Sequence, residues 1–350
     1  MKGIGLVVVA ATSIPALAQG WSPKLAAEYL DVREQSWNAW KTAQALGGAC
    51  FSCHTNMTYL LARPVLRRAL GEREPTPYEK AALDGLRTRI DMKDASAIKP
   101  AFGKDPLAAQ ATGVEAIFAA YFLAVENQGG SLTPQTERAF ERLWKLQARD
   151  GDSAGAWAWF SLDLDPWETT ESPYYGAAFA SMAVAAAPPA YRERPEVRGR
   201  IEALNEYLRA AGPAQPLHNR MLRLWVGGLD KPARERLIDE IAAKQQPDGG
   251  WTIAALGPFK QRPQAPVSEG GNAYATAYTA FLLERGGVPR SNAALARALD
   301  WLRRHQDPKG YWDAASMNKH FPEGSMQEGF MRDAATGFAV LALVEDAPQT

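Results

Sequence analysis

Cysteine is scarce in this 350-residue chain, which contains only two, so a disulfide-rich scaffold is excluded. An excess of one charge is also missing, because 39 basic side chains balance 39 acidic ones. We therefore expect no nucleic-acid or anionic-membrane surface. We see no apolar run of the roughly 20 residues that a membrane-spanning helix needs. With 46% apolar and 22% charged residues, the sequence predicts a globular protein with a sizeable core.

The N-terminus has the pattern of an export signal. Lys2 gives a short basic region, residues 3–11 are apolar, and residues 16–18 form an A-x-A cleavage site. The apolar run is too short to cross a bilayer, and Pro15 ends it. The sequence therefore predicts a signal peptide at residues 1–18 and a mature protein that starts at Gln19 in the periplasm.

Three segments of the chain repeat the same ending of a helix. In each, a Gln is followed by a Gly four residues later and then by a Trp, which packs in the turn while the Gln ties down free backbone groups. The Trp comes six residues after the Gln in two copies and ten residues after it in the first. The three sets are Gln147, Gly151 and Trp157; Gln245, Gly249 and Trp251; and Gln306, Gly310 and Trp312.

Two kinds of helix alternate along the chain. Small apolar residues dominate 106–126, 172–187, 217–226, 271–284 and 329–345, whereas 133–148, 195–211, 232–245 and 291–305 carry charges on one face. A buried inner ring inside an amphipathic outer ring predicts an all-α fold, an α/α toroid. The long connections at 147–172, 245–271 and 306–329 all leave from one end, which we expect to be the functional face.

The repeats resemble the QW motifs of the terpenoid-cyclase and protein-prenyltransferase toroid superfamily, chiefly its squalene–hopene cyclase branch. The resemblance covers about residues 105–346 and implies the fold. It implies little about activity, because the role of the motif in that family is structural.

The strongest chemical signal is the run Cys50-Phe51-Ser52-Cys53-His54, the C-x-x-C-H pattern of c-type haem attachment. The two thiols can form thioethers with the vinyl groups, and His54 can bind the iron. A redox disulfide, a zinc site and a structural pair of thiols are the alternatives. A redox disulfide belongs to βαβ folds, a zinc site lacks a suitably spaced fourth ligand, and a structural pair of thiols needs no His54. The resemblance to c-type cytochromes implies attachment outside the cytoplasm, which agrees with export.

The motif lies in a helical section that precedes the toroid. We expect one helix at 23–45 and another at 57–70 that is broken at Pro64. The predicted organisation is thus a signal peptide at 1–18, a helical haem-binding section at 19–104 and a toroid domain at 105–350.

The second axial ligand must come from elsewhere in the chain. Met57 shares a helical face with His54 and cannot reach the opposite side of a haem. The candidates lie on the expected functional face, and an open iron is the alternative. In order they are Met326 and Met331, then His320, then Met317 and His218.

Cyclase chemistry is the rival interpretation. Cyclases of the resembling family that start with a proton use a D-x-D-D motif, and the nearest segment here is Asp163-Leu164-Asp165-Pro166. The third carboxylate is missing, so cyclase activity is not expected, and whether the protein is an enzyme stays open. Four tyrosines could line an apolar cavity or fill the core: Tyr174, Tyr175, Tyr274 and Tyr278.

The sequence favours an exported protein with one covalent haem c that transfers electrons or serves as a haem-dependent partner of a redox protein. The alternative is a cyclase-like enzyme or a binder of an apolar, isoprenoid-like ligand. A third hypothesis is an interaction module whose haem senses redox state.

Overall fold

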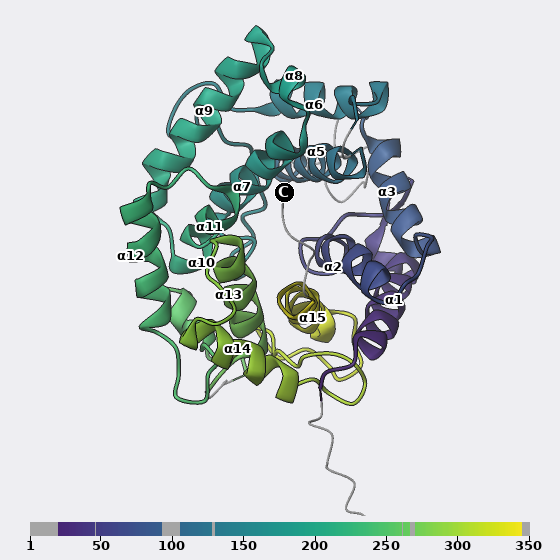
Figure 1. Ribbon diagram of the computed structural model, residues 1–350. Helices are drawn as coiled ribbons and strands as arrows, with labels where there is room; N and C mark the ends of the chain where they lie inside the picture. The colour runs from purple at the N-terminus through teal and green to yellow at the C-terminus, as the bar shows by residue number, and fades with distance from the viewer. Residues whose placement is uncertain are drawn as a thin grey trace, which may run out of the picture.

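The computed structural model describes residues 20–45, 47–92, 106–127, 130–260, 262–266 and 270–344. The predicted signal peptide at 1–18 lies outside these residues. Seen along its axis, the protein consists of two concentric rings of helices (Figure 1). Among the described residues the one sheet is a small hairpin of β1 (Gln44–Ala45) and β2 (Gly48–Ala49). The predicted all-α toroid is confirmed.

The inner ring contains the four most apolar of the long helices, together with shorter or more polar ones. Its members are α2 (Asn56–Ala69), α5 (Leu107–Glu126), α7 (Ser172–Ala186), α10 (Leu217–Arg220) with α11 (Arg223–Val226), α13 (Ala273–Arg285) and α15 (Phe330–Leu343). Small residues let these helices approach closely. A Cβ on Gly337 of α15 would lie 2.6 Å from the Cβ of Thr58 in α2, so only glycine fits at this crossing.

The outer ring is formed by helices of which all but the last have a proline in the first turn. They are α1 (Pro23–Ala39), α3 (Pro77–Arg89), α6 (Pro134–Leu146), α9 (Pro195–Ala211), α12 (Lys231–Ala242) and α14 (Ala293–Arg304), with the short α8 (Pro189–Arg192) beside α9. A side chain caps most of them, for example Thr76 at α3 and Asn292 at α14. A capping side chain accepts a hydrogen bond from a free backbone N–H group of the first turn, and a proline there removes one such group.

Three predicted helices differ in detail. The inner segment 217–226 is split into α10 and α11. The first helix ends at Ala39 rather than at residue 45, and a 3₁₀ turn, η1 (Lys41–Ala43), and the β hairpin follow it. The predicted break at Pro64 is absent, because α2 runs through it. Packing of α2 against α1, α3 and α15 outweighs the one hydrogen bond that proline removes.

The repeated glutamines link each outer helix to the next one. Gln245 Nε2 donates to the carbonyl oxygen of Gly249 at 2.8 Å and to that of Ala294, in α14, at 2.7 Å. Gln306 Nε2 donates in the same way to Gly310 and Ser22, both at 3.0 Å. Because Ser22 caps α1, this last glutamine joins the final outer helix to the first and closes the ring.

The first repeat follows the same design with a different glycine. Gln147 Nε2 donates to the carbonyl oxygen of Gly155, not to that of Gly151, and to that of Arg200. Gly155 has a φ of +91°, close to +98° at Gly249, and it precedes Trp157 by two residues. The predicted role of Gly151 is therefore wrong. Four extra residues separate the glutamine from its glycine, so a fixed spacing selects the wrong position.

The tryptophans of the repeats are buried and make equivalent contacts. Each indole N–H donates to the carbonyl oxygen of the residue four positions before the glutamine: Trp157 to Leu143, Trp251 to Ile241 and Trp312 to Leu302, at 2.7–2.8 Å. The motif therefore locks the last turn of an outer helix to the loop that follows it.

The N-terminal section completes the toroid. Helix α2 packs against α15, α1 packs against both, and α3 packs against α5 (Figure 1). One continuous hydrophobic core includes Leu30 and Leu66 as well as the residues of the later helices. The predicted boundary at residue 104 therefore marks a change in the character of the sequence. The helices on its two sides share one core.

Replacing Gly310 with alanine should be strongly destabilising. The residue has a φ of +95°, and a Cβ would lie 2.2 Å from the carbonyl oxygen of Leu25 in α1. Gly324→Ala is the matched control, because Gly324 has a φ of +73° but no atom within 4 Å of its Cβ position. We expect a loss of about 1–2 kcal/mol for the control from backbone strain alone, and about 3 kcal/mol more for Gly310→Ala. Equal losses in urea unfolding would contradict the proposed closure contact.

Candidate functional site

The C-x-x-C-H run lies between the β hairpin and the start of α2. Trp37 Nε1 of α1 donates to the carbonyl oxygen of Cys50 at 2.8 Å. Ser52 Oγ accepts hydrogen bonds from the backbone N–H groups of Thr55 and Asn56, and Asn56 Oδ1 accepts from the backbone N–H of Ser52 at 2.8 Å. The motif is therefore a fixed turn at a helix N-terminus.

The two thiols have different surroundings. Cys53 is 4% exposed and Cys50 is half-buried, and no disulfide joins them. Burial raises the pKa of the Cys53 thiol well above its ordinary value, and Glu168 and Glu115 add to the effect. Cys53 is consequently a neutral thiol that faces the interior of the toroid.

His54 is held in one tautomer by a relay of hydrogen bonds. Its Nδ1 lies 2.8 Å from Thr55 Oγ1, and Thr55 Oγ1 donates to Asp333 Oδ2 at 2.8 Å. Because an ionised carboxylate only accepts, the Thr55 hydroxyl must accept from Nδ1–H. The proton is thus on Nδ1, and the Nε2 lone pair is left for another partner. Burial, with a smaller contribution from Arg33, lowers the pKa of His54 to about 3, so the ring is neutral at pH 7.

Asp333 is the buried anchor of this relay. Arg33 Nε and Nη2 bind its two oxygens at 2.6 and 2.9 Å, and Tyr29 OH donates to Oδ1 at 2.8 Å. The carboxylate is 1% exposed. Burial raises the pKa of Asp333, while Arg33 and the hydrogen bonds from Thr55 and Tyr29 oppose this and favour the carboxylate. The charge-assisted bidentate pair with Arg33 also fixes its orientation.

Aromatic rings surround His54. Phe330, at the start of α15, stacks on it with ring centroids 3.7 Å apart, and Trp37 meets it edge-on at 5.2 Å. Trp167, from the loop 147–172, lies 6.3 Å away. The motif therefore faces the first and last long loops.

The long loops contact one another at this end. Asp165 and Asn318 exchange two hydrogen bonds, Lys260 pairs with Asp163, and the backbone N–H of His320 donates to the carbonyl oxygen of Gln264 at 3.0 Å. Three connections that are far apart in sequence thus form one face.

Two of the candidate distal ligands lie in the segment that contacts the His54 relay. Met331 directly follows Phe330 and is buried, and the carbonyl oxygen of Met326 accepts from Arg33 at 2.9 Å. The last loop also carries Met317, which is half-buried against the core, and His320, whose side chain is exposed.

His218 belongs to a separate cluster. It is fully buried, its Nε2 lies 2.7 Å from Tyr274 OH, and its Nδ1 lies 2.9 Å from Asn219 Oδ1. Burial lowers its pKa to about 4. Both ring nitrogens are thus engaged with protein groups.

The four tyrosines suggested for a cavity are fully buried. Tyr274 and Tyr278 stack with centroids 5.6 Å apart, and Tyr175 lies 5.1 Å from Phe179. Tyr174 donates to the carbonyl oxygen of Leu208. In the structure these rings are core side chains that pack among other aromatic residues.

Sequence reasoning missed two kinds of site residue. The first kind comprises the residues that orient His54, namely Thr55, Asp333 and Arg33. The sign of them in the sequence was a single Asp in the largely apolar run 330–343. Burial raises the pKa of Glu168 to about 7 and that of Glu34 to about 8. No pattern in the sequence distinguishes these two from surface carboxylates.

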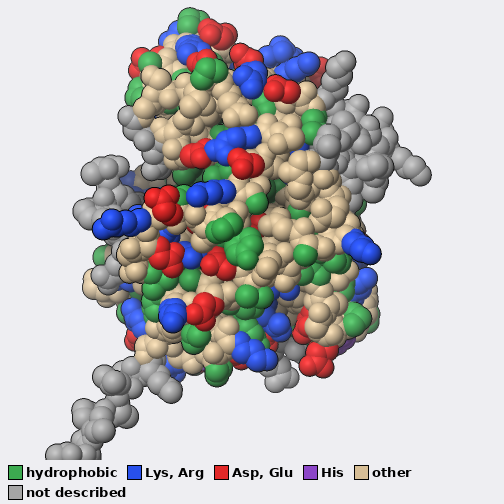
Figure 2. Space-filling view, turned by 90° about the vertical axis from the view of Figure 1, so that its right-hand side faces the viewer, with side chains coloured by type: hydrophobic (Ala, Val, Ile, Leu, Met, Phe, Trp, Pro, Cys, Tyr) green, Lys and Arg blue, Asp and Glu red, His purple; other side chains and the backbone are tan. Residues whose placement is uncertain are grey.

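Three further findings concern partners. Helix α5 is long and apolar enough to cross a membrane, but 78% of its apolar window is buried in the fold. In the described part of the chain, no three His, Cys, Asp or Glu side chains gather as a metal site. On the flank formed by α1 and α3, acidic and basic side chains are interspersed (Figure 2).

No protein-family model and no curated protein matches the sequence. Among solved structures, the chain is similar to a wild-type glycosidase, with 13% identity and a TM-score of 0.49 over 91% of this chain and 96% of that one. It is similar to the type II terpene cyclase MstE from Scytonema, with 16% identity and a TM-score of 0.46 over 92% and 97%. A polysaccharide lyase matches with 12% identity and a TM-score of 0.37 over 93% and 89%. Because the identities and TM-scores are this low, the functions of these proteins are not assigned to this chain.

Proposed function

We propose that this protein is an exported electron-transfer protein with one haem bound covalently through Cys50 and Cys53, with His54 Nε2 as the proximal ligand. The observation that carries the proposal is the Asp333–Thr55–His54 relay. It places the proton on Nδ1 and presents the Nε2 lone pair, as the histidine ligands of metals require.

The rest of the site suits a haem. The two thiols lie on one fixed turn, and Phe330, Trp37 and Trp167 offer an apolar, aromatic wall. A bound haem supplies a one-electron change between ferric and ferrous iron. The residues of the chain orient the imidazole, limit the access of water and raise the basicity of the ligand through the carboxylate.

Burial of Cys53 suggests an order of assembly. At 4% exposure, its sulfur is shielded in the folded chain, so thioether formation has to precede closure of the toroid. Attachment in the periplasm, right after export, fits this order. A redox partner protein then exchanges electrons with the iron.

Thr55→Val tests the relay directly. The valine keeps the shape of threonine but removes the hydroxyl, so the imidazole loses its link to Asp333 and becomes a weaker donor. We expect the reduction potential of the purified haem protein to rise by on the order of tens of millivolts, the equivalent of one hydrogen bond. Thr55→Ser keeps a hydroxyl and should stay near the wild-type value. Equal potentials in all three proteins would contradict the proposed role.

A second candidate function rests on Glu168. This carboxyl lies beside Trp167, and its raised pKa leaves a large fraction of it protonated near pH 7. A half-buried carboxylic acid that is partly protonated at neutral pH can supply the proton with which an acid-initiated conversion of an apolar substrate begins. Incubation with squalene and extraction of products would support it if wild type converts the substrate and Glu168→Gln does not.

A further inference from the structure

Tyr274 and His218 form a buried hydrogen-bonded pair that has no part in the function proposed above. Tyr274 belongs to α13 and His218 to α10, and both side chains are fully buried. Tyr274 OH lies 2.7 Å from His218 Nε2, and His218 Nδ1 lies 2.9 Å from Asn219 Oδ1. A phenol and an imidazole are therefore held together away from solvent.

The neighbours of the pair decide where its protons lie. Asn219 Nδ2 donates to the carbonyl oxygen of Glu171 and to Gln215 Oε1, so Asn219 Oδ1 is the atom that accepts from Nδ1–H of His218. Burial lowers the pKa of His218 to about 4, so the ring is neutral and Nε2 keeps a lone pair. The hydroxyl of Tyr274 must therefore donate to His218 Nε2.

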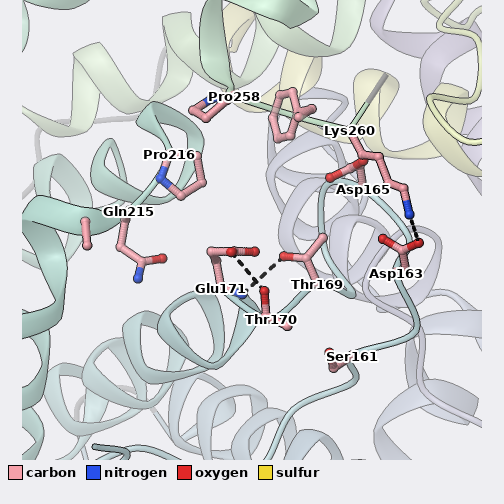
Figure 3. Close-up of a pocket in the computed structure, with 12 residues that line it drawn as sticks. Ser161, Asp163, Asp165, Thr169, Thr170, Glu171, Gln215, Pro216, Pro258 and Lys260 are labelled. Atoms are coloured by element: carbon pink, nitrogen blue, oxygen red, sulfur yellow. Dashed lines mark hydrogen bonds and ion pairs between the residues drawn. The ribbon is translucent and has the colours of Figure 1, made fainter. Parts of the chain in front are cut away.

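A pocket of about 390 Å³ opens close to the pair (Figure 3). Phe259 lines this pocket and meets the ring of His218 edge-on at 6.1 Å. Glu171 and Gln215, which bind Asn219, line it as well. The two members of the pair do not line it. Side chains therefore separate the pair from the open space of the pocket.

Trp167 links Tyr274 to the C-x-x-C-H run. Its indole N–H, which can only donate, donates to Tyr274 OH at 3.2 Å, and the two ring centroids are 5.4 Å apart. The same indole lies 6.3 Å from the ring of His54. Indole and phenol rings are the aromatic side chains that give up an electron most readily. A row of oxidisable rings thus joins the motif to the pair.

Oxidation of a buried tyrosine needs a base at hand. A phenol that has lost one electron is a strong acid, and a positive charge on its ring is costly in the interior. His218 Nε2 can take the proton along the existing hydrogen bond. The imidazolium that forms is stacked on Tyr278 with centroids 4.6 Å apart, and an aromatic face attracts a cation.

The same cluster contains a tyrosine without a base. Tyr175 is fully buried and its ring lies 5.9 Å from that of His218, yet its hydroxyl has no hydrogen-bond partner among the described residues. Because nothing accepts its proton, Tyr175 should be much harder to oxidise than Tyr274. It is therefore the matched control for the pair.

We propose that Tyr274 is a redox-active tyrosine that holds one oxidising equivalent, with His218 as its base. One electron leaves the phenol through Trp167, the O–H bond breaks, and the proton forms an N–H bond at His218 Nε2. The product is a neutral tyrosyl radical beside an imidazolium.

The oxidant that the proposal requires is a peroxide. It is reduced to water at the C-x-x-C-H site with one electron from Tyr274, one from the haem iron and two protons from solvent. This source of oxidising equivalents rests on the proposed haem, whereas the chemistry of the pair does not. Two experiments therefore test the pair and its link to the motif separately.

The first experiment uses the full mature chain without haem, as the variant Cys50→Ser/Cys53→Ser. Azide radicals from pulse radiolysis oxidise it, and electron paramagnetic resonance of frozen samples detects the product. We expect a long-lived neutral tyrosyl radical that Tyr274→Phe removes and Tyr175→Phe leaves unchanged. His218→Gln should slow its formation by about a hundredfold or more, the contribution of a positioned base.

The second experiment mixes the haem protein with hydrogen peroxide and freezes it rapidly. We expect the same radical, in a yield that Trp167→Phe lowers because phenylalanine is not oxidised. If the haem-free chain does not fold, the Tyr274→Phe and Tyr175→Phe variants of the haem protein decide. If Tyr274→Phe does not fold, the comparison of His218→Gln with wild type decides.

The inference is overturned if no radical forms at Tyr274, if Tyr175→Phe removes it equally, or if His218→Gln forms it at the wild-type rate. A radical at Tyr274 in the haem-free chain, but none with peroxide in the haem protein, would overturn the assigned oxidant. A radical at Tyr274 in a chain that never binds haem would support the pair and contradict only the proposed function.

Discussion

Asp333→Ala should lower the free energy of unfolding by about 3–5 kcal/mol, the usual loss when one member of a buried ion pair is removed. The substitution leaves the Arg33 guanidinium, whose side chain is 16% exposed, without its carboxylate. It also takes the acceptor from the hydroxyls of Tyr29 and Thr55. Urea unfolding followed by circular dichroism measures the loss.

The control for this experiment is Asp313→Ala. Asp313 pairs with Arg332 at 2.9 Å, but its side chain is 69% exposed, so we expect a loss below about 1 kcal/mol. Similar losses for the two variants would show that Asp333 is not the anchor of the site. Asp333→Asn, which keeps the shape of the side chain, separates the effect of charge from that of packing.

The double variant Cys50→Ser/Cys53→Ser should lose all covalently bound haem while keeping its helical content. Serine cannot form a thioether, yet it is close to cysteine in size, so the turn that Ser52 and Trp37 fix should survive. The mass and absorption spectrum report the haem, and far-ultraviolet circular dichroism reports the helices.

Each single variant should retain one thioether and hence a covalently bound haem. Haem that stays covalently bound in the double variant would rule out attachment at the motif. Loss of helicity together with the haem would mean that the haem is needed for folding of the whole toroid.

The fold could be predicted from sequence because its signals are local. Both signals, the alternation of apolar and amphipathic helices and the Gln–Gly–Trp repeat, can be recognised in short stretches of sequence. The character of a helix indicates whether it lies in the inner or the outer ring, and the repeat marks the end of an outer helix. What could not be predicted was the partner of each repeat. That Gln306 would bind Ser22, and so close the ring through the N-terminal section, depends on a contact across 284 residues.

The residues of the candidate site likewise fall into a group that the sequence predicts and a group that it does not. The C-x-x-C-H run is visible because its five residues are contiguous, and its turn forms from neighbours. The relay is invisible because Asp333 reaches Thr55 across 278 residues. The glycine of the first repeat was missed for a different reason, since an insertion in the loop moved it from 151 to 155 without changing its geometry.

The most direct test of the haem proposal is the intact mass and absorption spectrum of the wild-type protein, exported in a host that has the haem-ligation machinery. We predict a coloured protein that lacks residues 1–18, is heavier than the polypeptide by one haem, and keeps its colour through acid–acetone extraction. A colourless product at the mass of the bare polypeptide would contradict the account.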